Sequence, residues 1–109
     1  MEFHQLRYFV AAAELGSMSR AAEREHVTQP ALSRQIAQLE RRLGVPLFER
    51  KQQRIHLTEA GRFFLPKAQQ LLCDAATGEQ QLRELFGGEK RTLRIGFVNP
   101  VLDDLVAPA

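Results

Sequence analysis

The sequence predicts a mainly α-helical fold: a winged helix-turn-helix, made of three helices and a β-hairpin, followed by a long helix. Three observations predict it. Residues 18–43 read as a short helix, a tight turn and a longer helix with one apolar face. Residues 47–58 alternate apolar and polar side chains on either side of a polar turn. Residues 59–86 then carry apolar residues at three- and four-residue steps over several turns.

The first helix is expected over about residues 3–15, where apolar side chains recur at helical spacing. Its expected buried stripe consists of Phe3, Leu6, Phe9, Val10 and Ala13. Gly16 is a natural end for this helix, because glycine tolerates the left-handed backbone conformation. The first helix is therefore predicted to bury one side and to stop just before residue 17.

A short turn is expected to join the second and third helices. Ser17 and Ser19 both offer N-caps for the second helix, which we place at about residues 20–25. Val27 lies in the turn and is expected to fill part of the core. Thr28 is the candidate N-cap of the third helix.

The third helix has one apolar face and one polar face. Pro30 fits its first turn, where a missing N–H costs nothing, and Gly44 is expected to end it. The apolar face is formed by Leu32, Ile36, Leu39 and Leu43. The opposite face begins with Gln29, Pro30, Ser33 and Arg34. An amide, a hydroxyl and a guanidinium within about one and a half turns suit base edges in the major groove, so DNA binding is the leading hypothesis.

Two short strands, residues 47–50 and 54–58, are expected to form a hairpin after the third helix. Ile55 and Leu57 alternate with polar neighbours, which is the period of a half-buried strand. The turn near residues 51–53 is polar and basic. The basic residues clustered here without an intervening acid are Arg50, Lys51 and Arg54. Such a hairpin can lie along the DNA backbone or reach a minor groove.

The long helix is expected to begin after Thr58 as its N-cap and to run to about Phe86. Pro66 lies inside it and is expected to introduce a kink or a tight first segment. No other domain is expected to cover its apolar stripe, which therefore predicts a helix–helix dimer interface. The residues assigned to this interface are Phe64, Leu65, Ala68, Leu71, Leu72, Ala75, Leu82 and Leu85.

The remaining residues read as the start of another domain. Residues 87–90 are expected to form a hinge, followed by a buried strand in TLRIGFV and the beginning of a helix in VLDDLVAPA. A strand that leads directly into a helix is how α/β domains begin. We therefore expect a DNA-binding domain over residues 1–58, a linker and dimerisation helix with its hinge over residues 59–88, and the start of an α/β domain over residues 89–109.

Positive charge is concentrated where the DNA-binding hypothesis needs it. The net charge of the 109 residues is only +2, but residues 1–62 hold ten Lys/Arg against seven Asp/Glu, and residues 63–92 hold four of each. A surface that contacts phosphates needs local rather than global positive charge. The distribution of charge therefore agrees with the helix pattern.

No feature of the sequence favours an enzyme, a metal site or a membrane protein. The three histidines, His4, His26 and His56, lie in different elements without ligand spacing, and no catalytic Ser/His/Asp set or Gly-rich phosphate loop is present. No apolar run approaches the roughly 20 residues that span a bilayer, and no secretory signal is visible. Cys73 cannot form an internal disulfide and reads as a packing residue, so we expect a cytoplasmic protein without a cofactor in this chain.

Residues 3–61 resemble the N-terminal domain of LysR-type transcriptional regulators. The motifs that carry the resemblance are RAAE, QPALSRQI, LE with LG, PLFER and LTEAG, in this order and at compatible spacing. The long helix and TLRIGFV resemble that family's linker helix and the first strand of its effector-binding domain. By this resemblance, base contacts fall on Gln29, Pro30, Ser33 and Arg34, wing contacts on Arg50 and Arg54, and positions near the DNA backbone on Thr28 and Ala31.

The resemblance also implies partners. It implies a homodimer formed through the linker helix, a tetramer in the intact parent, a pseudo-palindromic promoter site, and a small-molecule effector bound in the C-terminal domain. That domain is considerably longer than the last residues of this chain. We therefore expect a fragment in which the effector site is essentially absent. One departure from the family pattern is the wing tip at residues 51–53, which lacks the glycine often found there.

Alternative interpretations of the chain and of its polar residues compete with these hypotheses. The chain as a whole could be a winged-helix assembly module that does not bind DNA and uses the long helix as its working surface. Ser33 and Arg34 could be a solvated helix face, and the wing arginines could serve only to keep an edge strand soluble. Arg20 and Arg24 either reach phosphates or carry ordinary surface charge.

Overall fold

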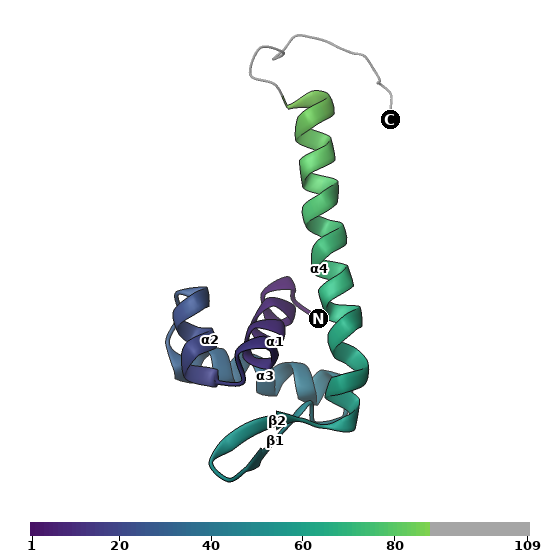
Figure 1. Cartoon of the computed structure of the whole chain (residues 1–109). Coiled ribbons are helices and arrows are strands. Elements are labelled where there is room, and N and C mark those ends of the chain that lie inside the picture. The colour runs from purple at the N-terminus through teal and green to yellow at the C-terminus, as the bar shows by residue number, and fades with distance from the viewer. Residues whose placement is uncertain (88–109) are drawn as a thin grey trace. The chain divides into compact units, whose positions relative to one another are not determined.

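Three helices, a two-stranded hairpin and a long fourth helix follow one another along the chain (Figure 1). The elements are α1 (Phe3–Leu15), α2 (Met18–Glu25), α3 (Gln29–Leu43), β1 (Phe48–Lys51), β2 (Arg54–Leu57) and α4 (Glu59–Phe86). The computed structural model describes residues 1–87, so most of the predicted hinge and the strand and helix predicted after it lie outside the described residues. The chain divides into two units, Met1–Cys73 and Asp74–Ala109. The predicted fold class is confirmed.

Short polar side chains set the beginnings of the helices. Ser17 accepts a hydrogen bond of 3.1 Å from the backbone N–H of Arg20, so α2 begins at Met18, two residues earlier than predicted. Of the two candidate caps, Ser17 is the one that the structure uses, and Ser19 lies inside the first turn of the helix. Thr28 caps α3 as predicted. Residues in the left-handed conformation end the first three helices: Gly16, His26 and Gly44.

Two clusters of apolar side chains form the core of the first unit. One joins α1, α2, α3 and the hairpin, and its buried residues include Tyr8, Ala11, Ala21, Leu32, Ile36 and Ile55. The other joins α1, α3 and the start of α4 through Leu6, Phe9, Val10, Leu39, Leu47 and Ala68. The prediction that Phe3 is buried is wrong, since this first residue of α1 is 49% exposed and its ring lies 5.8 Å from the Arg7 guanidinium.

The start of α4 packs against its own domain, which the sequence analysis did not anticipate. Ala68 is fully buried in the second cluster, and three further members of the predicted dimer interface pack against that cluster: Phe64, Leu65 and Leu72. Assigning Ala68 to a dimer interface was therefore wrong, because its side chain has no surface left for another chain. Ala75 is half-buried, and the members that are exposed are Leu71, Leu82 and Leu85. The helix continues through Pro66.

The hairpin is antiparallel and turns through two residues. Lys51 pairs with Arg54, so Gln52 and Gln53 form the turn, with φ values of 54° and 62°. Positive φ at both central residues is the geometry of a type I′ turn, which favours asparagine and glycine. The strand boundaries lie within one residue of the predicted ones. Leu47 is the main difference, because it is buried in the core instead of belonging to β1.

Polar contacts fix the base of the hairpin to both neighbouring helices. Glu40 on α3 accepts two backbone hydrogen bonds at the start of the hairpin, from Leu47 at 2.7 Å and from Phe48 at 3.2 Å. Thr58, at the end of the hairpin, donates its hydroxyl to the Pro46 carbonyl at 2.7 Å and caps α4. The hairpin is thus tied to α3 through a carboxylate and to α4 through a hydroxyl.

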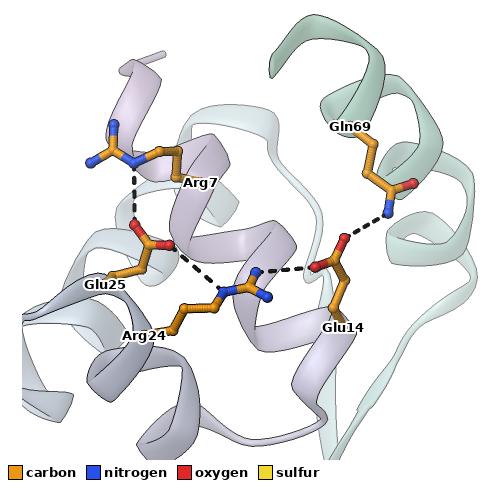
Figure 2. A network of polar contacts seen from close by, with 5 residues as sticks. All are labelled: Arg7, Glu14, Arg24, Glu25 and Gln69. Atoms are coloured by element: carbon orange, nitrogen blue, oxygen red, sulfur yellow. Dashed lines mark hydrogen bonds and ion pairs between the residues drawn. The ribbon is translucent and has the colours of Figure 1, made fainter. Parts of the chain in front are cut away.

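A chain of polar side chains joins α1, α2 and α4 on one surface of the first unit (Figure 2). Arg24 lies at its centre, with guanidinium nitrogens 3.1 Å from a Glu14 oxygen and 3.9 Å from a Glu25 oxygen. Arg7 binds the other Glu25 oxygen at 3.2 Å, and Gln69 donates to Glu14 at 3.0 Å. Exposed ion pairs contribute about 0–1 kcal/mol each, so this network orients the helices more than it stabilises them.

Candidate nucleic-acid interface

The N-terminal part of α3 faces solvent because the opposite side of the helix is buried. The residues that hold this helix in the core, each at most 2% exposed, are Leu32, Ile36 and Leu39. The predicted DNA-contacting residues exposed on α3 are Gln29, Pro30 and Arg34, whereas Ala31 and Ser33 are half-buried. Helical periodicity therefore displays an amide, a proline ring and a guanidinium on one side of the first turns.

A groove of about 380 Å³ lies between the start of α2, the start of α3 and the hairpin. We call it the donor groove, defined by its polar residues Ser17, Ser19, Arg20, Gln29, Arg50, Gln53 and Arg54. Three of these residues were assigned to DNA binding from the sequence: Gln29, Arg50 and Arg54. All the charged residues that line the groove are arginines, so it favours electron-rich groups such as phosphate oxygens and base acceptors.

The two wing arginines lie on opposite faces of the hairpin. Arg50 pairs with Ile55, and Lys51 pairs with Arg54, so side-chain alternation puts Arg50 on the face of buried Ile55 and Arg54 on the other. Arg50 also lines a smaller cavity of about 170 Å³ together with Ser33. Arg50 therefore connects the two predicted contact regions on α3, the one at Gln29 and the one at Ser33.

Several predicted contact residues lie outside the donor groove. Thr28 and Ala31 form the cap of α3, where the Thr28 hydroxyl accepts the Ala31 N–H at 3.3 Å. Lys51 lies 3.6 Å from the Glu49 carboxylate, which partly neutralises it. Pro30 and Arg34 are exposed on α3 and do not line the groove.

The arginines differ in how their guanidinium groups are used. Within residues 1–87, the side chains of Arg34, Arg50 and Arg54 make no ion pair, so their guanidinium groups are available to an external anion. Arg24, one of the two residues whose role the sequence left open, pairs with Glu14 and Glu25 inside its own domain. Arg20, the other, lines the donor groove.

Sequence reasoning missed the contribution of Ser19 and Gln53 to this groove. Ser19 was treated as a helix cap, but its hydroxyl donates to Gln29 Oε1 at 2.9 Å. The two residues are ten positions apart, and their approach depends on the left-handed turn residue His26 between α2 and α3. A histidine gives no clear sequence signal for that conformation. Gln53 was recognised only as a turn residue.

The part of the chain that the structure describes gives no support for a metal site or a membrane-spanning helix. Residues 1–87 contain no group of three or more His, Cys, Asp or Glu side chains that could hold a metal ion. No helix among these residues is long and apolar enough to cross a membrane. Cys73 is exposed on α4, and its expected packing in the dimer interface stays a prediction.

Comparison with known proteins gives consistent matches. Residues 3–62 match the family model of the bacterial regulatory helix-turn-helix proteins of the lysR family. The HTH-type transcriptional regulator TfdS of Cupriavidus pinatubonensis (strain JMP 134 / LMG 1197) is 46% identical over 102 residues, which cover 94% of this chain and 35% of TfdS. The chain thus spans about a third of the length of this relative.

Two solved DNA complexes have the same fold. The structure of the CbnR_DBD–DNA complex is 47% identical, with a TM-score of 0.73, covering 78% of this chain and 98% of the other. The structure of BenM_DBD with the benA site 1 DNA is 39% identical, with a TM-score of 0.76, covering 81% of this chain and 99% of the other. The match to both extends over nearly the whole of each compared chain.

Proposed function

We propose that this chain, which belongs to the lysR family of bacterial regulatory helix-turn-helix proteins, binds double-stranded DNA and regulates transcription. In this proposal the first turns of α3 enter the major groove, and the hairpin lies against the backbone or in the adjacent minor groove. The function class is that of a regulator and not of an enzyme.

The observation that carries the proposal is the arrangement of unpaired cations around the start of α3. Arg50 and Arg54 of the hairpin line the same groove as Gln29, and Arg34 lies exposed on α3. Guanidinium groups bind phosphates and guanine edges, and desolvating them without an anion is costly. CbnR_DBD and BenM_DBD, which share this fold, were both solved with DNA. These complexes do not favour the alternative of an assembly module without DNA binding.

The individual contacts within this proposal have distinct roles. We propose base contacts for Gln29, Pro30, Ser33 and Arg34, and backbone or minor-groove contacts for Arg50, Lys51 and Arg54, with Thr28 and Ala31 near the backbone. Arg20 joins the backbone contacts because it lines the donor groove. Phosphate contacts position the protein, whereas base contacts select the sequence.

Replacing Arg34 with alanine tests the proposed reading of bases. Arg34→Ala is expected to weaken binding to a selected site by about 1–3 kcal/mol, roughly 5- to 150-fold, and to relax the base preference at one position. Arg50→Ala is expected to weaken binding more evenly across sequences and to lower the salt dependence by about one phosphate contact. Fluorescence anisotropy of labelled duplexes over a range of salt concentrations measures both effects.

Arg41→Ala is the matched control for Arg34→Ala. Arg41 is an exposed arginine in the last turn of the same helix, so its removal changes the net charge equally. If Arg34→Ala and Arg41→Ala bind the selected site equally well and with unchanged base preference, the proposed role of the N-terminal part of α3 is wrong.

We propose that the chain forms a homodimer through α4, with a tetramer and a small-molecule effector in the intact parent and a cytoplasmic location. After the correction for Ala68, the residues that support a dimer are the large exposed apolar ones of α4: Phe63, Leu71, Leu82, Leu85 and Phe86. We also propose three segments: a DNA-binding domain over residues 1–58, a linker and dimerisation helix with its hinge over residues 59–88, and the start of an α/β domain over residues 89–109.

Sedimentation velocity at micromolar concentration tests the dimer. The unchanged chain is expected to sediment as a dimer, and Leu82→Arg is expected to shift it toward monomer by placing a charge on an apolar contact. Gln81→Arg, at an exposed neighbouring position, is the control that keeps the apolar contact. A monomer for the unchanged chain would remove the role proposed for α4.

A further inference from the structure

Ser19 makes a hydrogen bond to Gln29 that the fold does not need for its stability. Its hydroxyl donates to Gln29 Oε1 at 2.9 Å, and both side chains are exposed. An exposed hydrogen bond between side chains competes with water and adds little to stability. Ser17, two residues earlier, already caps α2. The consequence of the bond to Gln29 is therefore the orientation of the amide rather than support of the helix.

The orientation decides which groups Gln29 presents. A glutamine amide has one acceptor oxygen and an NH₂ group with two donors. The bond turns Oε1 toward Ser19, so the NH₂ group is the end of the amide directed at an external partner. Gln29 is also the first residue of α3, so its side chain lies at the end that is proposed to enter the major groove.

The residues around Gln29 also favour a partner that accepts hydrogen bonds. The donor groove contains Ser19 and Gln29 together with three arginines, and its lining includes no acidic residue. A partner in this groove therefore meets hydrogen-bond donors from α2, α3 and the hairpin. Such a partner must offer acceptors at the positions facing these residues.

The major-groove edges of the bases differ in what they offer. Guanine offers two acceptors, N7 and O6, whereas adenine offers the N7 acceptor and the N6 donor. Glutamine usually reads adenine with both ends of its amide, the oxygen accepting from N6 and the NH₂ group donating to N7. That mode requires Oε1 and the NH₂ group to face the base together, whereas the bond to Ser19 turns Oε1 toward α2.

We propose that Ser19 is a positioning residue that holds Oε1 of Gln29, so that Gln29 reads an acceptor edge and prefers guanine over adenine. The proposal rests on the proposed DNA binding and specifies one step of it. Without the hydroxyl of Ser19, the Gln29 amide is free to turn, and the adenine mode becomes available.

The test compares base preferences of the full chain and its variants. Sites are selected from random duplex DNA with the unchanged chain, and the position at which Gln29→Ala loses its preference is taken as the position that Gln29 reads. Duplexes that differ only there, guanine against adenine, are then titrated. We expect the unchanged chain to prefer guanine and Ser19→Ala to lose that preference by about fivefold or more. Ser19→Thr, which keeps the hydroxyl, is expected to restore it.

The results distinguish a failure of the proposed DNA binding from a failure of the proposed positioning role of Ser19. If the unchanged chain selects no site, the proposed function fails and the role of Ser19 fails with it. If it selects a site but Ser19→Ala keeps the same preference at that position, or if the unchanged chain prefers adenine there, only the positioning role is overturned. Thermal unfolding of Ser19→Ala is expected to match the unchanged chain, and a lowered midpoint with unchanged base preference would assign Ser19 a structural role instead.

Discussion

Replacing Gly61 with alanine is expected to destabilise the domain, because the start of α4 passes very close to the base of the hairpin. A Cβ at this position would lie 2.3 Å from the carbonyl oxygen of Leu47 and 2.8 Å from Cδ2 of Leu57. The oxygen belongs to the backbone and also accepts the Thr58 N–H at 3.0 Å. It cannot move away without breaking that bond, so α4 must shift by about 1 Å.

The expected size of the effect follows from these contacts. Forcing an extra methyl group into a packed site costs about 1–3 kcal/mol, and loosening the bond between Thr58 and Leu47 adds about 1 kcal/mol. The higher helix propensity of alanine offsets about 1 kcal/mol of this loss in the free energy of unfolding. The net loss is therefore about 1–3 kcal/mol, which lowers the unfolding midpoint of a domain of this size by roughly 5–20 °C.

Gly78→Ala is the matched control, because it makes the same chemical change in the same helix. Nothing lies within 4 Å of a Cβ at Gly78, so this variant is expected to gain about 0.5–1 kcal/mol of local helix stability. Thermal unfolding followed by far-UV circular dichroism measures both variants. The reasoning is refuted if Gly61→Ala unfolds at the same temperature as the unchanged chain or above it.

Two further predictions concern the hairpin. Glu40→Ala is expected to cost about 1–3 kcal/mol, because it leaves the N–H of Leu47, a residue only 1% exposed, without its acceptor. Glu40→Gln keeps an acceptor and should cost less, and equal losses for both variants in urea unfolding would contradict this. Gln53→Gly is expected to gain about 0.5–1 kcal/mol, since glycine adopts the φ of 62° without strain; a lowered thermal midpoint would contradict that expectation.

The elements were largely predictable because local chemistry sets their ends. The cap at Thr28 and the glycines at positions 16 and 44 bound their helices as expected. The end of α4 at Phe86 was also predicted correctly. The start of α2 was displaced by two residues because two serines were equally good caps, and only the backbone geometry selects Ser17.

Long-range packing was harder to predict than the helix ends. The apolar stripe of the fourth helix looked like an uncovered surface, because a periodic pattern does not say which partner covers it. In the structure Ala68 is covered by the second apolar cluster of its own domain and not by another copy of the chain. The wing arginines and the α3 residues of the candidate site were predicted from the sequence. Ser19 was missed because its hydrogen bond to Gln29 depends on the geometry of the turn between α2 and α3.

Selection of bound fragments from random double-stranded DNA tests the central claim, that the start of α3 and the hairpin read a DNA sequence. We predict that the unchanged chain enriches one motif present as two inverted half-sites, and that Arg34→Ala loses the preference at a base of each half-site. A selected pool that stays random at low salt, or a motif that Arg34→Ala enriches unchanged, would contradict the claim.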